Sequence, residues 1–424
     1  MTLVPLSLIT RSFARIGLLS FGGPAAQIAL MHRELVEDRR WLTESQFLRA
    51  LSFCMLLPGP EAMQLATYAG WKLRGTPGGL IAGALFVLPG ACVIAALALA
   101  YAHWGTQPAT AALLVGVKAT VIAIVAQALW RLSRKALRGR ADIILAIAAF
   151  AALWGLKLPF PLVIVLAALW GAWQARKTPA PHPLDRSDTA RPDLATQTRT
   201  ALIWTLLWLA PLPLLWLADQ SLLFDLAAFF AKLAVVTFGG AYAVLAYMAQ
   251  EVVQTRGWLT PDAMVDALGL AETTPGPLIL VTQFVGMLTG AAAGGPALAL
   301  VAGVLVLWMT FVPCFLWIFV AAPHVEGLLS RPRLQGALAA ISAAVVGVIA
   351  NLSLWFALHV LFGTVTTRSL GPLSLDLPRL ASLDMTALGL TCLAAGLLIG
   401  LNRSVPLVLL ICAATGAAVG GPFA

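Results

Sequence analysis

Apolar segments long enough to cross a lipid bilayer follow one another along almost the whole chain. A helix needs ~20 apolar residues to cross a ~30 Å hydrocarbon layer. Of the 424 residues, 60% are hydrophobic and only 11% are charged, too few charges for a soluble fold to cover its apolar surface. Because lipid offers no partners to backbone groups, and because we find no alternating strand pattern, we predict an all-α polytopic membrane protein. Thirteen spans are expected, near 7–30, 46–70, 77–102, 110–131, 141–156, 159–175, 200–217, 222–249, 262–290, 295–321, 335–361, 385–401 and 404–421.

The cations predict the orientation of these spans, since cytoplasmic loops carry an excess of Lys and Arg. With the N-terminus in the cytoplasm, the basic cluster in 131–140 and the loop around Arg256 fall inside. The loops 157–158 and 362–384 and the C-terminus then fall outside. The loop 32–49 is the exception, because its four arginines fall on the outer side. Most of the net charge of +9 therefore anchors loops, and we expect no nucleic-acid partner.

The chain repeats itself at a constant offset of 217 residues. Over positions 13–60 the two copies share 19 identities in 48 aligned pairs without a gap, which indicates duplication. We predict a first transmembrane half (1–177), a Pro-rich cytoplasmic linker (178–199) and a second half (200–424) whose repeat core begins near 222. One extra span precedes that core, so the halves are expected to be inverted, which is an architecture of alternating-access transporters. A parallel duplication is the alternative.

Two motifs predict helix breaks in both halves. Phe-Gly-Gly lies mid-span, where adjacent glycines weaken a helix. Pro-Gly-Pro removes two amide donors and disfavours the α conformation before each proline. Non-helical backbone at membrane depth is tolerated only where it is buried or lines a wet cavity, and the half-helix that follows offers its N-terminus to an anion. Close packing of small residues is the alternative for the glycines. The break residues are Phe21, Gly22, Gly23, Pro58, Gly59, Pro60, Phe238, Gly239, Gly240, Pro275, Gly276 and Pro277.

Polar and charged residues near these breaks are candidate substrate ligands. Arg15 and Lys232 occupy matching positions ahead of Phe-Gly-Gly, and Lys118 lies inside the fourth expected span. Such cations suit an anionic substrate, with snorkelling to the membrane surface as the alternative. Glu61 and Glu272 are candidate proton-coupling or gating groups, with an ion pair to one of these cations as the alternative. The remaining candidates are Gln27, Gln64 and Gln283.

These motifs resemble the chromate ion transporter family in its long form of two fused halves. The resemblance rests on Phe21–Gln27, Trp41–Thr43, Leu57–Gln64 and the second copies of the glycine and proline motifs. It implies a secondary carrier of the bacterial inner membrane that exports chromate and confers chromate resistance. With the orientation that the cations predict, the N-terminus is then cytoplasmic and the C-terminus periplasmic. The halves are not expected to contribute equally, because the second copy departs from the first at three positions in or next to the motifs. There Ala241, Val244 and Leu278 replace Pro24, Gln27 and Glu61.

An anion channel, or a carrier of another oxyanion such as sulfate, is the main alternative function. We expect no enzyme, because the sequence shows no nucleophile and base near the membrane surface, and no primary pump, because the phosphate-loop pattern GxxxxGK[ST] is absent. No cofactor or metal is expected, since the five cysteines and five histidines lack metal-ligand spacing. Chromate or a similar oxyanion and the bilayer are the expected partners, and a homodimer is left open.

Overall fold

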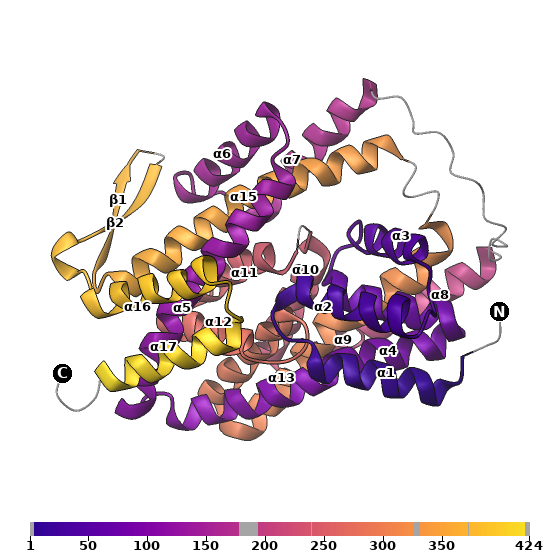
Figure 1. Cartoon of the computed structure of the whole chain (residues 1–424), viewed down its shortest axis with the longest axis horizontal. Coiled ribbons are helices and arrows are strands. Elements are labelled where there is room, and N and C mark those ends of the chain that lie inside the picture. Colours follow the sequence, from indigo (N-terminus) through magenta and orange to yellow (C-terminus); the bar gives the residue numbers. More distant parts are fainter. Residues whose placement is uncertain (1–3, 178–193, 239, 326–330, 372, 420–424) are drawn as a thin grey trace. The chain divides into compact units, whose positions relative to one another are not determined.

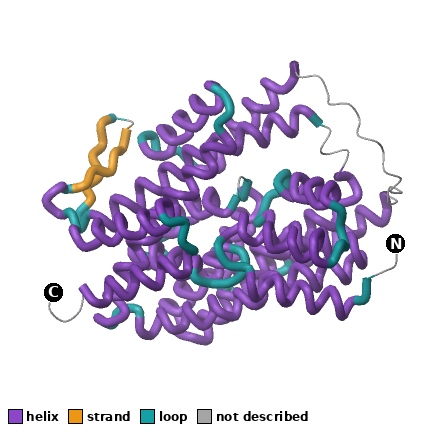
Figure 2. The backbone as a smooth tube through the Cα atoms, viewed as in Figure 1, coloured by secondary structure: helices purple, strands orange, loops and turns teal. Residues whose placement is uncertain are grey.

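The computed structural model describes residues 4–177, 194–238, 240–325, 331–371 and 373–419, almost all of them in helices (Figures 1 and 2). Most of the predicted linker and Gly239 lie outside this part. The chain forms two compact units, each assembled from segments of both halves. Unit 1 consists of Met1–Leu99, Pro179–Ala241 and Thr274–Pro332, and unit 2 of Ala100–Thr178, Tyr242–Thr273 and Arg333–Ala424.

Unit 1 holds the helices that carry both kinds of predicted break. They are α1 (Leu6–Leu19), α2 (Gly23–His32), the π-helical turn η1 (Arg33–Asp38), α3 (Glu44–Cys54), most of α4 (Glu61–Trp104), α8 (Leu194–Leu209), α9 (Pro211–Leu217), α10 (Ser221–Val236), η4 (Leu278–Leu280), α13 (Val281–Ala321) and η5 (Ala322–His324).

Unit 2 holds the later helices of each half and a strand pair. They are α5 (Pro108–Ala136), α6 (Arg140–Trp154), α7 (Phe160–Gln174), η2 (Ala175–Lys177), most of α11 (Ala241–Ala249), the π-helical turn η3 (Gln250–Thr255), α12 (Pro261–Glu272), α15 (Pro332–Leu361), β1 (Val365–Leu370), β2 (Leu373–Pro378), η6 (Leu380–Ser382), α16 (Met385–Ala395), η7 (Gly396–Gly400) and α17 (Val405–Val419).

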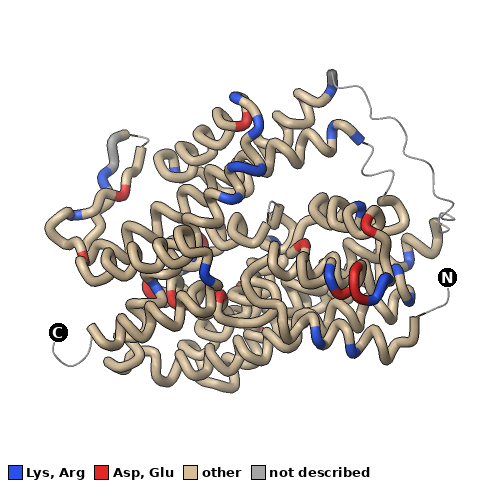
Figure 3. Tube along the Cα trace, viewed as in Figure 1, with Lys and Arg blue, Asp and Glu red and all other residues tan. Residues whose placement is uncertain are grey.

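Several helices carry the apolar length that a membrane requires. By length and composition, five helical segments in the described residues could cross one: Glu61–Trp104, Pro108–Ala136, Leu194–Leu217, Leu278–His324 and Pro332–Leu361. Figure 3 shows how few charged residues lie along such helices. The expectation of a helical membrane protein is confirmed in this form, whereas thirteen crossings stay a prediction.

The two longest helices each fold back on themselves. In α4 the backbone leaves the helical conformation at Arg74 and Gly75, and α13 does the same at 294–295. The arms of α4 touch, because a β-carbon at Gly70 would collide with the backbone carbonyl of Gly78. A close approach through glycine is how helices pack tightly in lipid. Each long helix is therefore a helical hairpin with one short and one long arm.

The first expected span is also a hairpin. Arg15 on α1 and Glu34 on η1 form an ion pair, with Nη1 and Oε2 3.6 Å apart. In one straight helix these residues would be about 28 Å apart at 1.5 Å per residue, far beyond the reach of their side chains. The chain must turn back between α1 and α2, so the segment 7–30 is not one straight helix. The turn coincides with Phe-Gly-Gly, where the glycines supply the backbone freedom that it needs.

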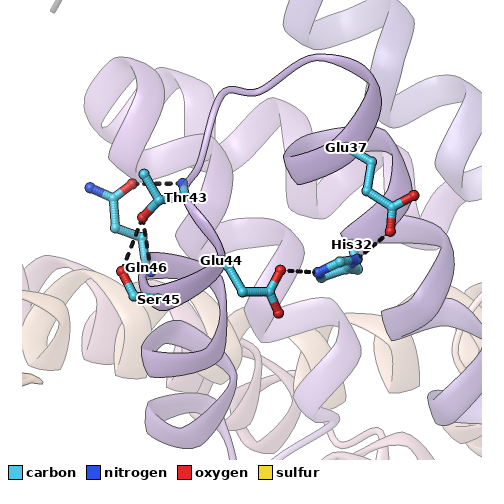
Figure 4. Close-up of polar contacts among 6 residues, drawn as sticks. All are labelled: His32, Glu37, Thr43, Glu44, Ser45 and Gln46. Carbon is cyan, nitrogen blue, oxygen red and sulfur yellow. Dashed lines mark hydrogen bonds and ion pairs between the residues drawn. The ribbon is translucent and has the colours of Figure 1, made fainter.

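The loop between η1 and α3 is held by side-chain contacts (Figure 4). His32 bridges the two elements, because its Nε2 lies 2.6 Å from Glu44 Oε2 and its Nδ1 lies 3.0 Å from Glu37 Oε1. Thr43 caps α3 by accepting a hydrogen bond from the Gln46 amide at 3.2 Å, and the Gln46 side chain accepts one from the Thr43 amide. This capping box fixes where α3 begins.

The duplicated segments keep the same local structure in both copies. The π-helical turns η1 and η3 lie 217 residues apart, and in each copy an arginine covers a tryptophan ring. Arg39 lies 4.9 Å from the centre of Trp41, and Arg256 lies 4.7 Å from that of Trp258. The helices that follow are capped by Thr43 and by its counterpart Thr260, as expected. Repetition of such an uncommon element strengthens the evidence for duplication.

The two halves exchange helices within unit 2. The glycine of α7, Gly171, packs against Gly336 at the start of α15, and the glycine of α17, Gly416, packs against Gly116 in α5. Helices α6 and α7 thus pair with the long helix of the second half, while α16 and α17 pair with the long helix of the first. The same kind of helix pairing therefore occurs twice, with the halves exchanged.

Unit 2 also contains a strand pair that the sequence analysis missed. Strands β1 and β2 are antiparallel, with Val365 opposite Pro378. The overlooked signal is the β-branched run Val365–Thr367, followed by Gly371, whose φ of 63° suits a tight turn. Asp376 on β2 accepts hydrogen bonds from Lys157 Nζ and Thr367 Oγ1, both at 2.7 Å. Burial alone would raise the pKa of Asp376, but these donors outweigh it and lower the pKa below its ordinary value.

A pocket in unit 2 brings together loops that were expected on opposite sides of the membrane. Lys157 and Asp376 line it, from loops expected outside. Gln254 and Pro261 line the same pocket, from the loop expected inside. His359, near the end of α15, also lines this pocket. The two assignments cannot both hold, so the predicted order of crossings is wrong at one of these loops.

Candidate functional site

The Pro-Gly-Pro break of each half is hydrogen-bonded to the Phe-Gly-Gly break of the other half. The Gly59 amide donates to the Thr237 carbonyl at 2.9 Å, and the Gly276 amide donates to the Ser20 carbonyl at 2.8 Å. Ser20 and Thr237 are themselves repeat partners, 217 residues apart, and each directly precedes Phe-Gly-Gly. All of these residues belong to unit 1. The breaks therefore form two crossed sites, each with one motif from each half.

The Phe-Gly-Gly breaks are helix starts with glycine in the left-handed region. Gly22 and Gly23 have φ of 86° and 78°, and Gly240 has φ of 96°. Helix α2 begins at Gly23, with Pro24 in its first turn where no amide is needed. In the second half α11 begins at Ala241. The predicted breaks are present at both motifs in the described residues, with Gly239 outside them.

Both Pro-Gly-Pro breaks are also present, but the amide of the central glycine in each already donates a hydrogen bond. Gly59 and Gly276 have φ of 122° and 88°, which only glycine adopts readily. Helix α4 starts directly after the first motif, at Glu61, and η4 starts after the second. Because both glycine amides bond to carbonyls of the other half, they are not free donors for an anion. Any anion would have to use the first amides of the helices that follow.

The first crossed site contains a carboxylate. Glu61 Oε1 lies 3.9 Å from the position that a β-carbon on Gly240 would take. Gln64, one turn further along α4, donates from Nε2 to the Pro58 carbonyl at 2.7 Å. Cys314 of α13 lies 3.1 Å from the β-carbon position of Gly59. This site joins an acid and an amide around the first Pro-Gly-Pro.

The second crossed site has an amide where the first has an acid. Gln27 donates from Nε2 to the Gly276 carbonyl at 2.6 Å, which links α2 to the second Pro-Gly-Pro. Leu278 stands at the position that matches Glu61. Gly90 of α4 lies so close to the Pro275 carbonyl that a β-carbon would not fit. The predicted inequality of the halves thus takes the form of one acidic and one uncharged site.

Three predicted glutamines are buried with an unused acceptor. Gln283 donates from Nε2 to the Ala91 carbonyl at 3.0 Å, much as Gln27 and Gln64 bond to carbonyls at the breaks. The Oε1 atoms of all three side chains are buried and have no hydrogen-bond partner in the described part of the chain. A buried acceptor without a donor costs free energy of about 1–3 kcal/mol. These atoms suit water or a protonated ligand oxygen.

The predicted cations stand in different environments. Arg15 is 61% exposed and pairs with Glu34. Lys232 is also exposed. Lys118 belongs to unit 2 and lies 2.7 Å from Asp262 and 3.8 Å from Asp266. Its positive charge is therefore already matched by carboxylates, so a role of any of these cations in binding the substrate stays a prediction.

Glu272 ends α12 in unit 2 and is buried, with Oε1 accepting a hydrogen bond from Tyr242 at 2.9 Å. Sequence reasoning missed Asp266, six residues earlier on the same helix, which accepts a hydrogen bond from Tyr101 at 2.8 Å. The available signal was a carboxylate inside an apolar segment. It also missed Ser20 and Thr237, which act through backbone carbonyls and so carry no signal in residue type.

The fold and its crossed breaks define a helical, multi-pass membrane protein built from a duplicated half. The chain belongs to the chromate transporter family, whose model matches residues 8–172 and 224–417, one block in each half. This is a family of transporters and not of enzymes.

Three curated relatives resemble the chain over most of its length. A chromate transport protein of Pseudomonas aeruginosa is 33% identical over 80% of this chain and 77% of its own. A probable chromate transport protein of Synechococcus elongatus is 31% identical over 81% and 82%. A chromate transport protein of Cupriavidus metallidurans is 31% identical over 80% and 79%. No solved structure matches the chain.

Proposed function

We propose that this protein is a secondary transporter that exports chromate, or a related tetrahedral oxyanion, across the bacterial inner membrane by alternating access. The observation that carries the proposal is the reciprocal pair of hydrogen bonds between the breaks. Two half-sites related by exchange of the halves can take equivalent positions on opposite sides of a membrane, which is the basis of alternating access in repeat transporters. The names of the relatives supply the substrate.

The membrane potential favours this direction of transport. When a divalent anion leaves a negative interior, its electrical free energy falls by about 2.3 kcal/mol per charge per 100 mV. Export lowers the internal concentration of chromate, which is how such a carrier would confer resistance. The acidic crossed site at Glu61 would act as a gate, and the uncharged second crossed site would bind the anion through the first amides of the helix that follows its Pro-Gly-Pro.

We further propose that the halves are inverted and that α1 and α2 form a re-entrant hairpin. The loop 32–49 would then return to the cytoplasmic face, where its four arginines obey the positive-inside rule. In the inverted copy the loop 250–261 would lie on the periplasmic face. Its place in one pocket with Lys157 and Asp376 supports that side. The count of thirteen crossings falls accordingly.

The sidedness test uses a matched pair of positions. Arg40 and Gly257 are repeat partners, both exposed and both with φ above 50°. After the native cysteines are replaced, R40C should react with a membrane-impermeant maleimide only in inverted vesicles, and G257C only in right-side-out vesicles. Labelling of both positions from the same side would overturn the inverted arrangement.

The transport test measures uptake of chromate into inverted vesicles, with sulfate as competitor and with or without a pH gradient. A carrier gives saturable uptake and counterflow of labelled substrate against unlabelled substrate. Uptake that does not saturate and shows no counterflow would favour a channel. Saturable uptake of sulfate with no response to chromate would reassign the substrate while leaving the mechanism intact.

A further inference from the structure

We propose that Asp266 in unit 2, together with Lys118 and Tyr101, is a proton-exchange site that couples transport to the proton gradient. The proposal rests on the transport function above and places coupling on a residue outside the crossed sites. The three side chains come from α12, α5 and the end of α4, and all three belong to the same unit.

The Asp266 carboxylate is buried and only half of it is satisfied. Its side chain is 4% exposed. Oδ2 accepts the Tyr101 hydrogen bond at 2.8 Å and lies 3.8 Å from Lys118 Nζ. Oδ1 is also buried and has no partner among the described residues. Oδ1 therefore shares a buried negative charge that no donor stabilises. Protonation of Oδ1 would remove that charge.

The net charge of the cluster that Lys118, Asp262 and Asp266 form also favours uptake of a proton. Lys118 faces two carboxylates, Asp262 and Asp266, so one positive charge meets two negative charges. Asp262 is 73% exposed and keeps its hydration, whereas the surplus charge falls on the buried Asp266. Uptake of one proton from water by Oδ1 makes the cluster neutral, and return of that proton to water restores the charge. Lys118 and Asp262 stay paired in both states, at 2.7 Å.

The position of Asp266 connects it to the breaks. Its helix packs on α5 through Gly269, where a β-carbon would collide with Val117. The same helix ends at Glu272, and the second Pro-Gly-Pro begins three residues later. The link from Asp266 to the second Pro-Gly-Pro therefore runs along the chain, through the end of α12.

The first half has no counterpart to this group. The repeat partner of Asp266 is Arg49, whose Nε donates to the Ser45 carbonyl at 3.2 Å in an exposed position. The binding breaks are duplicated but the carboxylate is not. Because Asp266 occurs in one half only, this site would exchange a single proton in each transport cycle.

The test compares Asp266→Asn with Asp262→Asn in proteoliposomes. Asn keeps the shape of the side chain but cannot exchange a proton. We expect D266N to lose the stimulation of chromate flux by a pH gradient and to keep counterflow at equal pH within about twofold. D262N removes the second carboxylate that faces Lys118, so Lys118 would stabilise the charged form of Asp266. The pH profile of the stimulation should therefore move to lower pH in D262N, with counterflow at equal pH unchanged. Stimulation of D266N equal to that of the wild type would overturn the proposal.

A second variant covers the case in which D266N does not insert. Tyr101→Phe removes the donor to Oδ2, which stabilises the charged carboxylate, so the midpoint of the pH profile of transport should move to higher pH. An unchanged profile would contradict the coupling role. A wild-type protein without saturable chromate flux would refute the proposed function itself, which separates the two failures.

Discussion

Replacement of Gly59 by alanine should abolish transport, whereas the same change at Gly75 should not. Both glycines have positive φ, 122° and 63°. For an alanine such backbone costs about 1–3 kcal/mol, because Gly75 also has ψ of −157°, a region that glycine alone adopts readily. The two positions differ in their surroundings, since a β-carbon at Gly75 would meet nothing within 4 Å. Gly75 is therefore a matched control for the conformational cost alone.

The additional cost at Gly59 follows from its contacts. A β-carbon there would lie 2.7 Å from Gln64 Nε2 and 3.1 Å from Cys314 Sγ. Gln64 would have to leave the Pro58 carbonyl, and an unpaired buried polar group costs about 1–3 kcal/mol. We therefore expect losses in the free energy of unfolding of about 2–6 kcal/mol for G59A and about 1–3 kcal/mol for G75A.

Two measurements check this difference. The thermal midpoints of the purified variants in detergent should fall in the order wild type, G75A, G59A. Chromate uptake per inserted molecule should stay near the wild-type rate in G75A and fall to background in G59A. If G59A transported as fast as G75A, the crossed site around the first Pro-Gly-Pro would play no part in transport.

Two further predictions concern the polar contacts of unit 1. The pKa of His32 is raised above its ordinary value of 6.5, chiefly by the hydrogen bond to the Glu44 carboxylate. Its contribution to stability is therefore complete below pH ~6.5 and disappears as the pH rises through the higher folded-state pKa. The wild-type thermal midpoint should decline over that interval more than that of Glu44→Gln, and parallel curves would exclude this linkage. Gln27→Leu removes the donor to the Gly276 carbonyl, so the KM for chromate should rise. The amount of inserted protein should stay the same, because Val244 shows that the matching position accepts an apolar side chain. An unchanged KM would argue against the second crossed site.

Patterns of residue type predicted the local structure well. The glycine and proline motifs marked the helix breaks, since the backbone conformations at Gly22 and Gly59 are ones that glycine favours. The caps at Thr43 and Thr260 were predicted for the same kind of reason, because a hydroxyl at that position satisfies a free amide.

Long-range partners were not predictable in this way. The Gly59 amide meets the Thr237 carbonyl, and any residue has a carbonyl. Lys118 looked like a cation available to a substrate because its carboxylate partners lie 144 and 148 residues further along the chain. The expected span 7–30 was judged by its apolar length, which a hairpin and a crossing share. The ion pair of Arg15 with Glu34 distinguishes them.

The crossed breaks have a consequence for how the protein is made. The amide of Gly59 cannot reach its acceptor until Thr237 has left the ribosome, roughly 180 residues later, which corresponds to about 10–35 s of synthesis. At the membrane depth that the sequence predicts for this break, lipid offers no substitute for the missing acceptor during that time. A half-length chain made alone would keep this defect unless a second copy supplied the missing carbonyl. Fusion of the two halves into one polypeptide guarantees that the acceptor always arrives.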